Sequence, residues 1–197
     1  MFLLDQARFE PVKLGILAGS FNPPTLAHVA LAKAALQVVD QVLFVLPRRF
    51  PHKEYVGASM DERVGMLGTV AGADDRFLAA VSDGGLFADI ACEAHCMFPQ
   101  AELWFVCGRD AAERIMSWNY GDACMLPRMM ESFGLLVARR QGEYVPPVEY
   151  AHRIESLPFE SYDEHSSTEV RERIERGEEW RRLVPPEIVE EVARIYS

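Results

Sequence analysis

Short, almost purely apolar segments alternate with longer helical segments along most of this 197-residue chain. Runs such as VLFVL (42–46) and LWFVC (103–107) lack the alternation of apolar and polar residues that marks a strand with one face in water. Such strands are typical of a parallel sheet that helices cover on both faces. The pattern predicts a doubly wound α/β fold, in which ligands bind at the carboxyl ends of the strands.

The predicted elements follow one another without a repeat or a linker, so we expect a single domain over residues 1–197. Ser59 and Glu62 form a capping-box pattern at one helix start, and Gly177 ends another helix. The C-terminal part, from about 166 to 197, is expected to be helical. The sequence predicts strands at 12–18, 41–47, 76–82, 102–108, 133–140 and 152–158, and helices at 25–39, 59–72, 86–97, from Asp110, at 166–177 and at 185–197.

The formal net charge of −10 argues against general binding to nucleic acids or to anionic membranes. No apolar run approaches the roughly 20 residues of a membrane-spanning helix. The opening MFLLDQARFEP has neither the basic leader nor the apolar stretch of a signal peptide. We therefore expect a cytoplasmic protein with no nucleic-acid or membrane partner, in which any anionic ligand is held by a local positive site.

Cys92, His95 and Cys96 have the i, i+3, i+4 spacing that places side chains on one face of a helix. A metal site is one interpretation of this spacing. Packing of the side chains in the core is the interpretation we favour, because isolated Cys and His residues on a helix more often serve that role.

Glycine, hydroxyl and basic side chains follow the ends of the predicted strands. The stretch GSFNPPT (19–25) and His28 follow the first strand, Arg48–Lys53 follow the second, and Gly108–Asp110 follow the fourth. Arg139 follows the fifth strand. Because the carboxyl ends of parallel strands meet at one edge of a sheet, this grouping in an acidic chain indicates a polyanionic ligand.

Each of these signals also has a purely structural explanation. Gly19 serves either a tight turn or the close approach of a phosphate to the backbone. His28 alone would be a packed core residue, but beside Ser20 and Thr25 a phosphate-facing role is favoured. Trp118 is either a core residue or an exposed platform for a ring.

The same two interpretations apply near the C-terminal end. Ser166, Ser167 and Thr168 form either a helix cap with spare hydroxyls or, together with Arg171, a clamp for terminal phosphates. Arg139 and its neighbour Arg140 are either surface charges or part of the anion site.

Several motifs together resemble one family. GSFNPPTLAH (19–28) resembles the (H/T)xxH phosphate-binding motif of the nucleotidyltransferase superfamily, and SSTEVR (166–171) resembles its SSTxxR motif. CGRDAAERIMSW (107–118) is similar to the GxDx₇W segment of the nicotinate- and nicotinamide-mononucleotide adenylyltransferases. PHK (51–53) and LLVARRQGEY (135–144) also stand where those enzymes carry similar stretches, so the resemblance covers nearly the whole chain.

The resemblance implies a Rossmann-like fold of the nucleotidyltransferase type and a reaction in NAD biosynthesis. AMP passes from ATP to nicotinate or nicotinamide mononucleotide, and the products are the dinucleotide and pyrophosphate. The mononucleotide phosphate attacks the α-phosphate of ATP in line, so catalysis consists of positioning and charge neutralisation. Mg²⁺ enters with ATP, and no protein ligand for a metal is implied.

By the same resemblance, His28 and Thr25 contact the ATP phosphates, Asp110 meets a ribose and Trp118 stacks on the pyridine ring. The catalytic set is His28, Thr25 and Arg171. The implied ATP-binding residues are Gly19, Ser20, Phe21, Thr25, His28, Gly108, Asp110, Ser167, Thr168 and Arg171, and the implied mononucleotide-binding residues are Ser20, Phe21, Lys53, Trp118 and Arg139.

The chain departs from the family pattern in three places. Thr25 replaces the first histidine of the HxGH form, and Ala27 replaces its glycine. Where bacterial nicotinate enzymes usually carry a Tyr-Thr pair, this chain has GLFADIAC (85–92), so the choice between acid and amide stays open. A sister transferase acting on another phosphate acceptor, such as phosphopantetheine, and a non-catalytic nucleotide-binding module are the alternatives. A homo-oligomer is also left open.

Overall fold

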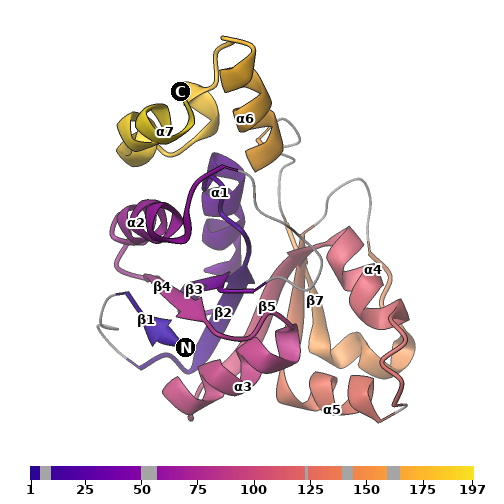
Figure 1. Cartoon of the computed structure of the whole chain (residues 1–197). Coiled ribbons are helices and arrows are strands. Elements are labelled where there is room, and N and C mark those ends of the chain that lie inside the picture. The colour runs from indigo at the N-terminus through magenta and orange to yellow at the C-terminus, as the bar shows by residue number, and fades with distance from the viewer. Residues whose placement is uncertain (5–9, 50–56, 123, 139–143, 159–164) are drawn as a thin grey trace.

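The computed structural model describes residues 1–4, 10–49, 57–122, 124–138, 144–158 and 165–197. Its strands form one seven-stranded sheet in the order β1-β4-β3-β2-β5-β6-β7 (Figure 1). The strands are β1 (Phe2–Leu3), β2 (Lys13–Ala18), β3 (Gln41–Pro47), β4 (Phe77–Ser82), β5 (Glu102–Gly108), β6 (Gly134–Ala138) and β7 (Ile154–Leu157). The α-helices are α1 (Leu26–Ala35), α2 (Met60–Ala71), α3 (Phe87–Met97), α4 (Arg109–Ser117), α5 (Met125–Ser132), α6 (Ser167–Glu175) and α7 (Val189–Tyr196), and the 3₁₀ turns are η1 (Val148–Arg153), η2 (Arg181–Leu183) and η3 (Pro186–Ile188).

Strands β2 to β7 run parallel, which confirms the predicted α/β class. Ile16 of the central strand lies between Leu43 of β3 and Phe105 of β5. The short strand β1 differs, since it pairs antiparallel with β4 at the edge of the sheet. A two-residue edge strand carries too little pattern to be found in the sequence.

Helices cover both faces of the sheet, as the continuous apolar strands predict (Figure 1). One face packs against α3, α4 and α5, through side chains such as Ile90, Ile115 and Met129. The other face packs against α1 and α2, through side chains such as Ala32 and Leu67.

The C-terminal helices pack on α2 rather than on the sheet. Met66 and Val70 of α2 belong to a buried cluster with Val170 of α6 and Val192 of α7. Trp180, which lies between these two helices in the sequence, is also part of this cluster. This apolar contact holds α6 next to the loop that follows β2, although the two lie far apart in the sequence. None of the helices within the described ranges is both long and apolar enough to cross a membrane.

Four further elements differ from the sequence prediction. Helix α1 ends at Ala35 because the chain turns there and buries Val39 against the sheet. Helix α5 was not predicted, since Pro127 interrupts its pattern; the proline lies in the first turn, where its missing N–H has no intrahelical partner to lose. The predicted strand 152–158 begins only at Ile154, after η1, and the predicted helix 185–197 consists of η3 followed by α7.

Candidate active site

The two motifs from opposite ends of the chain meet at the loop after β2. The Ser167 hydroxyl donates a hydrogen bond to the Pro23 carbonyl oxygen at 2.7 Å. Nη1 of Arg171 donates to the Asn22 carbonyl oxygen at 2.6 Å and to the Ser167 carbonyl oxygen at 3.2 Å. Nη2 of Arg171 also lies 3.4 Å from the Thr168 hydroxyl. The N-terminal turn of α6 and the N-terminal turn of α1 therefore border one site.

Thr25 and His28 are locked together at the start of α1. The Thr25 backbone N–H donates to Nδ1 of His28 at 3.0 Å, and the Thr25 hydroxyl lies 2.8 Å from the same nitrogen. Since Nδ1 accepts a hydrogen bond from the backbone N–H, the neutral imidazole carries its own proton on Nε2. Burial lowers the pKa of His28 to about 4, so the ring is neutral at pH 7. Thr25 is fully buried and orients the histidine.

The tight turn after β2 is made by Phe21 and not by Gly19 as expected. Phe21 has a φ of 45° and a fully buried ring, which packs edge-on against the His28 ring at a centroid distance of 5.1 Å. A Cβ atom on Gly19 would come within 3.2 Å of this ring. Gly19 therefore makes room for Phe21, and Phe21 can offer a ligand only its backbone.

Residues that the sequence analysis did not single out hold this loop through hydrogen bonds. Oδ1 of Asn22 accepts a hydrogen bond from the Tyr196 hydroxyl at 2.5 Å and another from the Ala58 N–H at 3.2 Å. The buried Arg63 lies with Nη1 at 3.4 Å from the Ser20 carbonyl oxygen. Burial raises the pKa of Tyr196, so its hydroxyl stays protonated and can donate. No local pattern marks these residues, because their partners are distant in the chain.

A second group of expected residues follows β5, the strand next to β2 in the sheet. A Cβ atom on Gly108 would meet no other atom within 4 Å, so open space borders this position. Asp110 is exposed in the first turn of α4. Because β2 and β5 are parallel neighbours, Ala18 and Gly108 end at the same edge of the sheet.

A cavity of about 550 Å³ lies between the start of α3, helix α4 and helix α5. Trp118 borders it with 55% of its surface exposed, which excludes the interpretation as a core residue. The lining is mostly apolar, and Phe87 is further stacked on Phe105 at a centroid distance of 4.5 Å. The lining residues are Gly85, Leu86, Phe87, Ala88, Ala111, Arg114, Ile115, Trp118, Tyr120, Met125 and Met129.

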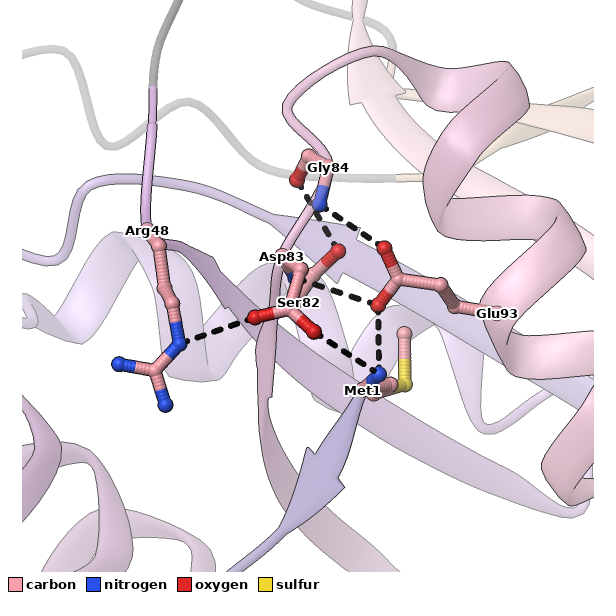
Figure 2. Close-up of polar contacts among 6 residues, drawn as sticks. All are labelled: Met1, Arg48, Ser82, Asp83, Gly84 and Glu93. Carbon is pink, nitrogen blue, oxygen red and sulfur yellow. Dashed lines mark hydrogen bonds and ion pairs between the residues drawn. The ribbon is translucent and has the colours of Figure 1, made fainter.

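The turn from β4 to α3, which brings Leu86 and Phe87 to this cavity, is held by polar contacts (Figure 2). The Glu93 carboxylate accepts the N–H of Gly84 at 2.8 Å and that of Asp83 at 3.2 Å. It also lies 2.8 Å from the Met1 amino group. Burial opposes the charge on Glu93, but these hydrogen bonds outweigh it and lower the pKa of the carboxyl group.

Arg48, expected near the anion site, instead lies with Nε at 3.1 Å from Asp83, beside the same turn (Figure 2). Its guanidinium therefore belongs to the β4–α3 turn in this structure. Lys53 and Arg139, two expected contacts of the mononucleotide, lie outside the described residues, as does Arg140.

The core-packing interpretation of Cys92, His95 and Cys96 is wrong, because all three residues are exposed on α3. Within the part of the chain that the structure describes, no three His, Cys, Asp or Glu side chains lie close enough to hold a metal ion.

The chain is similar to known proteins over most of its length. The model of the cytidylyltransferase-like family matches residues 16–173. A protein of Thermus thermophilus named probable nicotinate-nucleotide adenylyltransferase is 33% identical over 181 residues, which cover 88% of this chain and 92% of the relative. A protein of Gloeobacter violaceus with the same name is 31% identical over 193 residues, which cover 90% of this chain and 91% of the relative.

Solved structures share the fold. Nicotinic acid mononucleotide adenylyltransferase of Plasmodium falciparum, complexed with NaAD, superposes with a TM-score of 0.68 at 16% identity, over 92% of this chain and 95% of that chain. A crystal structure from Vibrio parahaemolyticus, described as that of a "putative nicotinate-nucleotide adenylyltransferase", superposes with a TM-score of 0.62 at 16% identity, over 92% of this chain and 98% of that chain. With the family match over most of its length and relatives above 30% identity, the chain belongs to the cytidylyltransferase-like family and, within it, to the nicotinate-nucleotide adenylyltransferases.

Proposed function

We propose that this protein transfers AMP from ATP to nicotinate mononucleotide, or to its nicotinamide counterpart, in NAD biosynthesis. An oxygen of the mononucleotide phosphate forms a bond to the α-phosphorus of ATP. The bond from that phosphorus to the bridging oxygen of the β-phosphate breaks, and pyrophosphate leaves. The names of the relatives support this activity.

One observation carries the proposal: the contact of Ser167 and Arg171 with the loop at Asn22 and Pro23. It joins two helix N-termini, whose N–H groups and positive dipole ends favour phosphate. The three contacts of Arg171 use three of the five N–H donors of its guanidinium, so donors remain for phosphate oxygens. In this arrangement the backbone N–H of Ser167, the hydroxyl of Thr168 and the guanidinium of Arg171 hold the β- and γ-phosphates.

His28 is the donor at the reacting phosphate. Its proton on Nε2 is held in place because Thr25 fixes Nδ1, so the ring needs no reorganisation when charge grows on the phosphate oxygens. Burial lowers the pKa of the ring, so His28 is neutral and donates from Nε2 as a neutral imidazole. Thr25 acts on the phosphates through His28.

The remaining contacts follow the two strand ends. The backbone of Gly19, Ser20 and Phe21 lies against the nucleotides, and Gly108 and Asp110 bind a ribose. Trp118 stacks on the pyridine ring. Lys53 and Arg139 remain proposed contacts of the mononucleotide.

Mg²⁺ is part of the substrate in this scheme, bound to the phosphates of ATP and to water. The cytoplasm is the proposed compartment, because the exposed free thiols of Cys92, Cys96 and Cys124 suit a reducing environment.

The test is release of pyrophosphate from MgATP in the presence of single acceptors: nicotinate mononucleotide, nicotinamide mononucleotide, phosphopantetheine and glycerol phosphate. Chromatography identifies the adenylylated product, and the His28→Ala protein serves as the control for contaminating activity. We expect a dinucleotide with at least one pyridine mononucleotide. Turnover with phosphopantetheine alone would assign the chain to a sister transferase, and turnover with none would contradict catalysis.

A further inference from the structure

The cavity beside Trp118 has a single charged side chain in its described lining, that of Arg114. Arg114 lies in the last turn of α4, four residues before the C-cap residue Trp118, and both residues line the cavity. Leucine, isoleucine, methionine, phenylalanine and alanine side chains make up most of the remaining wall. A lone cation in such a wall can discriminate between ligands by charge.

Neighbouring arginines are engaged elsewhere. Nε of Arg109 lies 2.6 Å from Glu113, and Arg128 on α5 lies 4.0 Å from Asp122. For Arg114, no carboxylate of the described chain lies within ion-pair distance. Its guanidinium is therefore available to an anionic group of a ligand.

The turn at the opposite side of the cavity offers no polar side chain. Gly85, Leu86 and Phe87 occupy the place where the resemblance led us to expect a Tyr-Thr pair. What remains there is backbone, including N–H groups in the first turn of α3 that have no intrahelical partner. Side-chain recognition of a charged ring substituent must therefore come from another element.

We infer that Arg114 is a specificity-determining residue that binds the carboxylate of the nicotinate ring and so favours the acid over the amide. A planar guanidinium matches a carboxylate and gains a charge-assisted hydrogen bond, whereas a carboxamide offers it only a neutral oxygen. Leu86 and Ile115 pack against the apolar edge of the ring, and Trp118 stacks on its face. This inference rests on the proposed function.

The experiment compares both mononucleotides as acceptors in steady-state kinetics with saturating MgATP. Arg114→Met keeps the length and apolar cover of the side chain and removes its charge. We expect kcat/KM for nicotinate mononucleotide to fall about tenfold, because one charge-assisted contact at a partly solvated site is lost. The kcat/KM for nicotinamide mononucleotide should stay within about twofold of the wild-type value. The acid-to-amide ratio of kcat/KM therefore falls. The backbone N–H groups of α3 keep the loss from being complete.

Two further variants sharpen the result. Arg114→Lys retains the charge without the planar fork, and we expect it to restore part of the acid preference. Arg128→Met removes a nearby exposed charge that does not line the cavity, and we expect the wild-type ratio. A Michaelis constant for ATP that stays constant in all variants shows that the effect belongs to the acceptor.

The outcomes separate the two hypotheses. If the unmodified protein uses nicotinate mononucleotide and Arg114→Met leaves the acid-to-amide ratio unchanged, the inference is wrong and the proposed function stands. Equal losses with both acceptors would also overturn it, since they show a general effect on the cavity. If the unmodified protein uses neither mononucleotide, the proposed function is wrong and the inference with it.

Discussion

The loop between β2 and α1 (residues 19–25) and the cavity beside Trp118 are built in opposite ways. Residues 21–25 of this loop are buried, and the loop is held by hydrogen bonds from Arg171, Ser167 and Tyr196. The cavity is mostly apolar and borders an exposed Trp118. Groups that stabilise developing charge act best when they are fixed in advance, whereas a pocket that selects an acceptor depends on shape and a few polar groups. Substitutions in the two regions should therefore affect different kinetic constants.

The largest effect is expected from His28→Ala. Loss of one preorganised donor should lower kcat by roughly 10²–10³ and leave most of the ATP affinity, since the interaction grows in the transition state. His28→Asn should fall between, because its amide keeps an N–H donor but not the position that Thr25 gives to the imidazole. Steady-state kinetics measure the effect, with circular dichroism as the control for folding. Normal turnover by His28→Ala would make the histidine a packing residue.

Arg171→Ala comes next, with an expected increase of about 10- to 100-fold in the KM for ATP. The change removes a charge-assisted contact to the phosphate tail together with the contact that holds α6 to Asn22. Arg176→Ala, which removes an exposed charge from the end of the same helix, is the matched control. An ATP KM equal to that of the control would return Arg171 to a purely structural role.

His28, at the start of α1, should also make the stability of the protein depend on pH. The pKa of His28 is about 4 in the folded protein, compared with 6.5 for a histidine in the unfolded chain. The unfolded chain therefore binds the extra proton first as the pH falls. This contribution is fully present above pH 6.5 and is lost between about pH 6.5 and 4. We expect this contribution to the free energy of unfolding to be about 1–2 kcal/mol, because His28 is partly exposed and solvent weakens the effect.

Urea unfolding of the wild type and of His28→Asn at pH 7, 5.5 and 4.5 measures this contribution. The variant should lose less stability than the wild type over the same interval. Parallel curves would show that His28 is not desolvated in the folded state.

Trp118→Ala should give the smallest effect and the sharpest contrast with the loop. We expect the mononucleotide to bind about tenfold more weakly and ATP binding to stay nearly unchanged, by analogy with the roughly 1–3 kcal/mol of base–aromatic stacking. Because the side chain is 55% exposed, folding should not suffer. Isothermal titration with each substrate separates the two affinities. An equal loss for ATP would remove the distinction between the regions.

Much of the fold could be predicted because the strands of a doubly covered sheet are apolar throughout, as VLFVL is. The loop with Thr25 and His28 was found for a related reason, since it stands directly after such a strand. The residue in the left-handed conformation was not found, because packing of the Phe21 ring overrides the usual preference for glycine. Helix α5 was missed because a proline in a first turn resembles a helix breaker.

The support of the loop by Arg63 and Tyr196 could not be predicted by any local rule. The partners are distant in the chain, so the contact depends on how α2 and α7 pack. The position of Arg114 in the cavity wall has the same origin, because it needs α3, α4 and α5 to be placed against one another.

The hydrogen bond between Tyr196 and Asn22 has a consequence for the order in which the molecule assembles. It joins residues 174 positions apart, and the contact of Arg171 with Asn22 spans 149. Contacts of such separation close the largest loops and carry the greatest entropic penalty, so they form late in folding. On a chain emerging from the ribosome, β2 and α1 appear early, but the loop between them lacks its contacts with Arg171 and Tyr196 until α6 and α7 have been synthesised. The protein therefore becomes catalytically competent only after α6 and α7 have been synthesised and have packed on the loop.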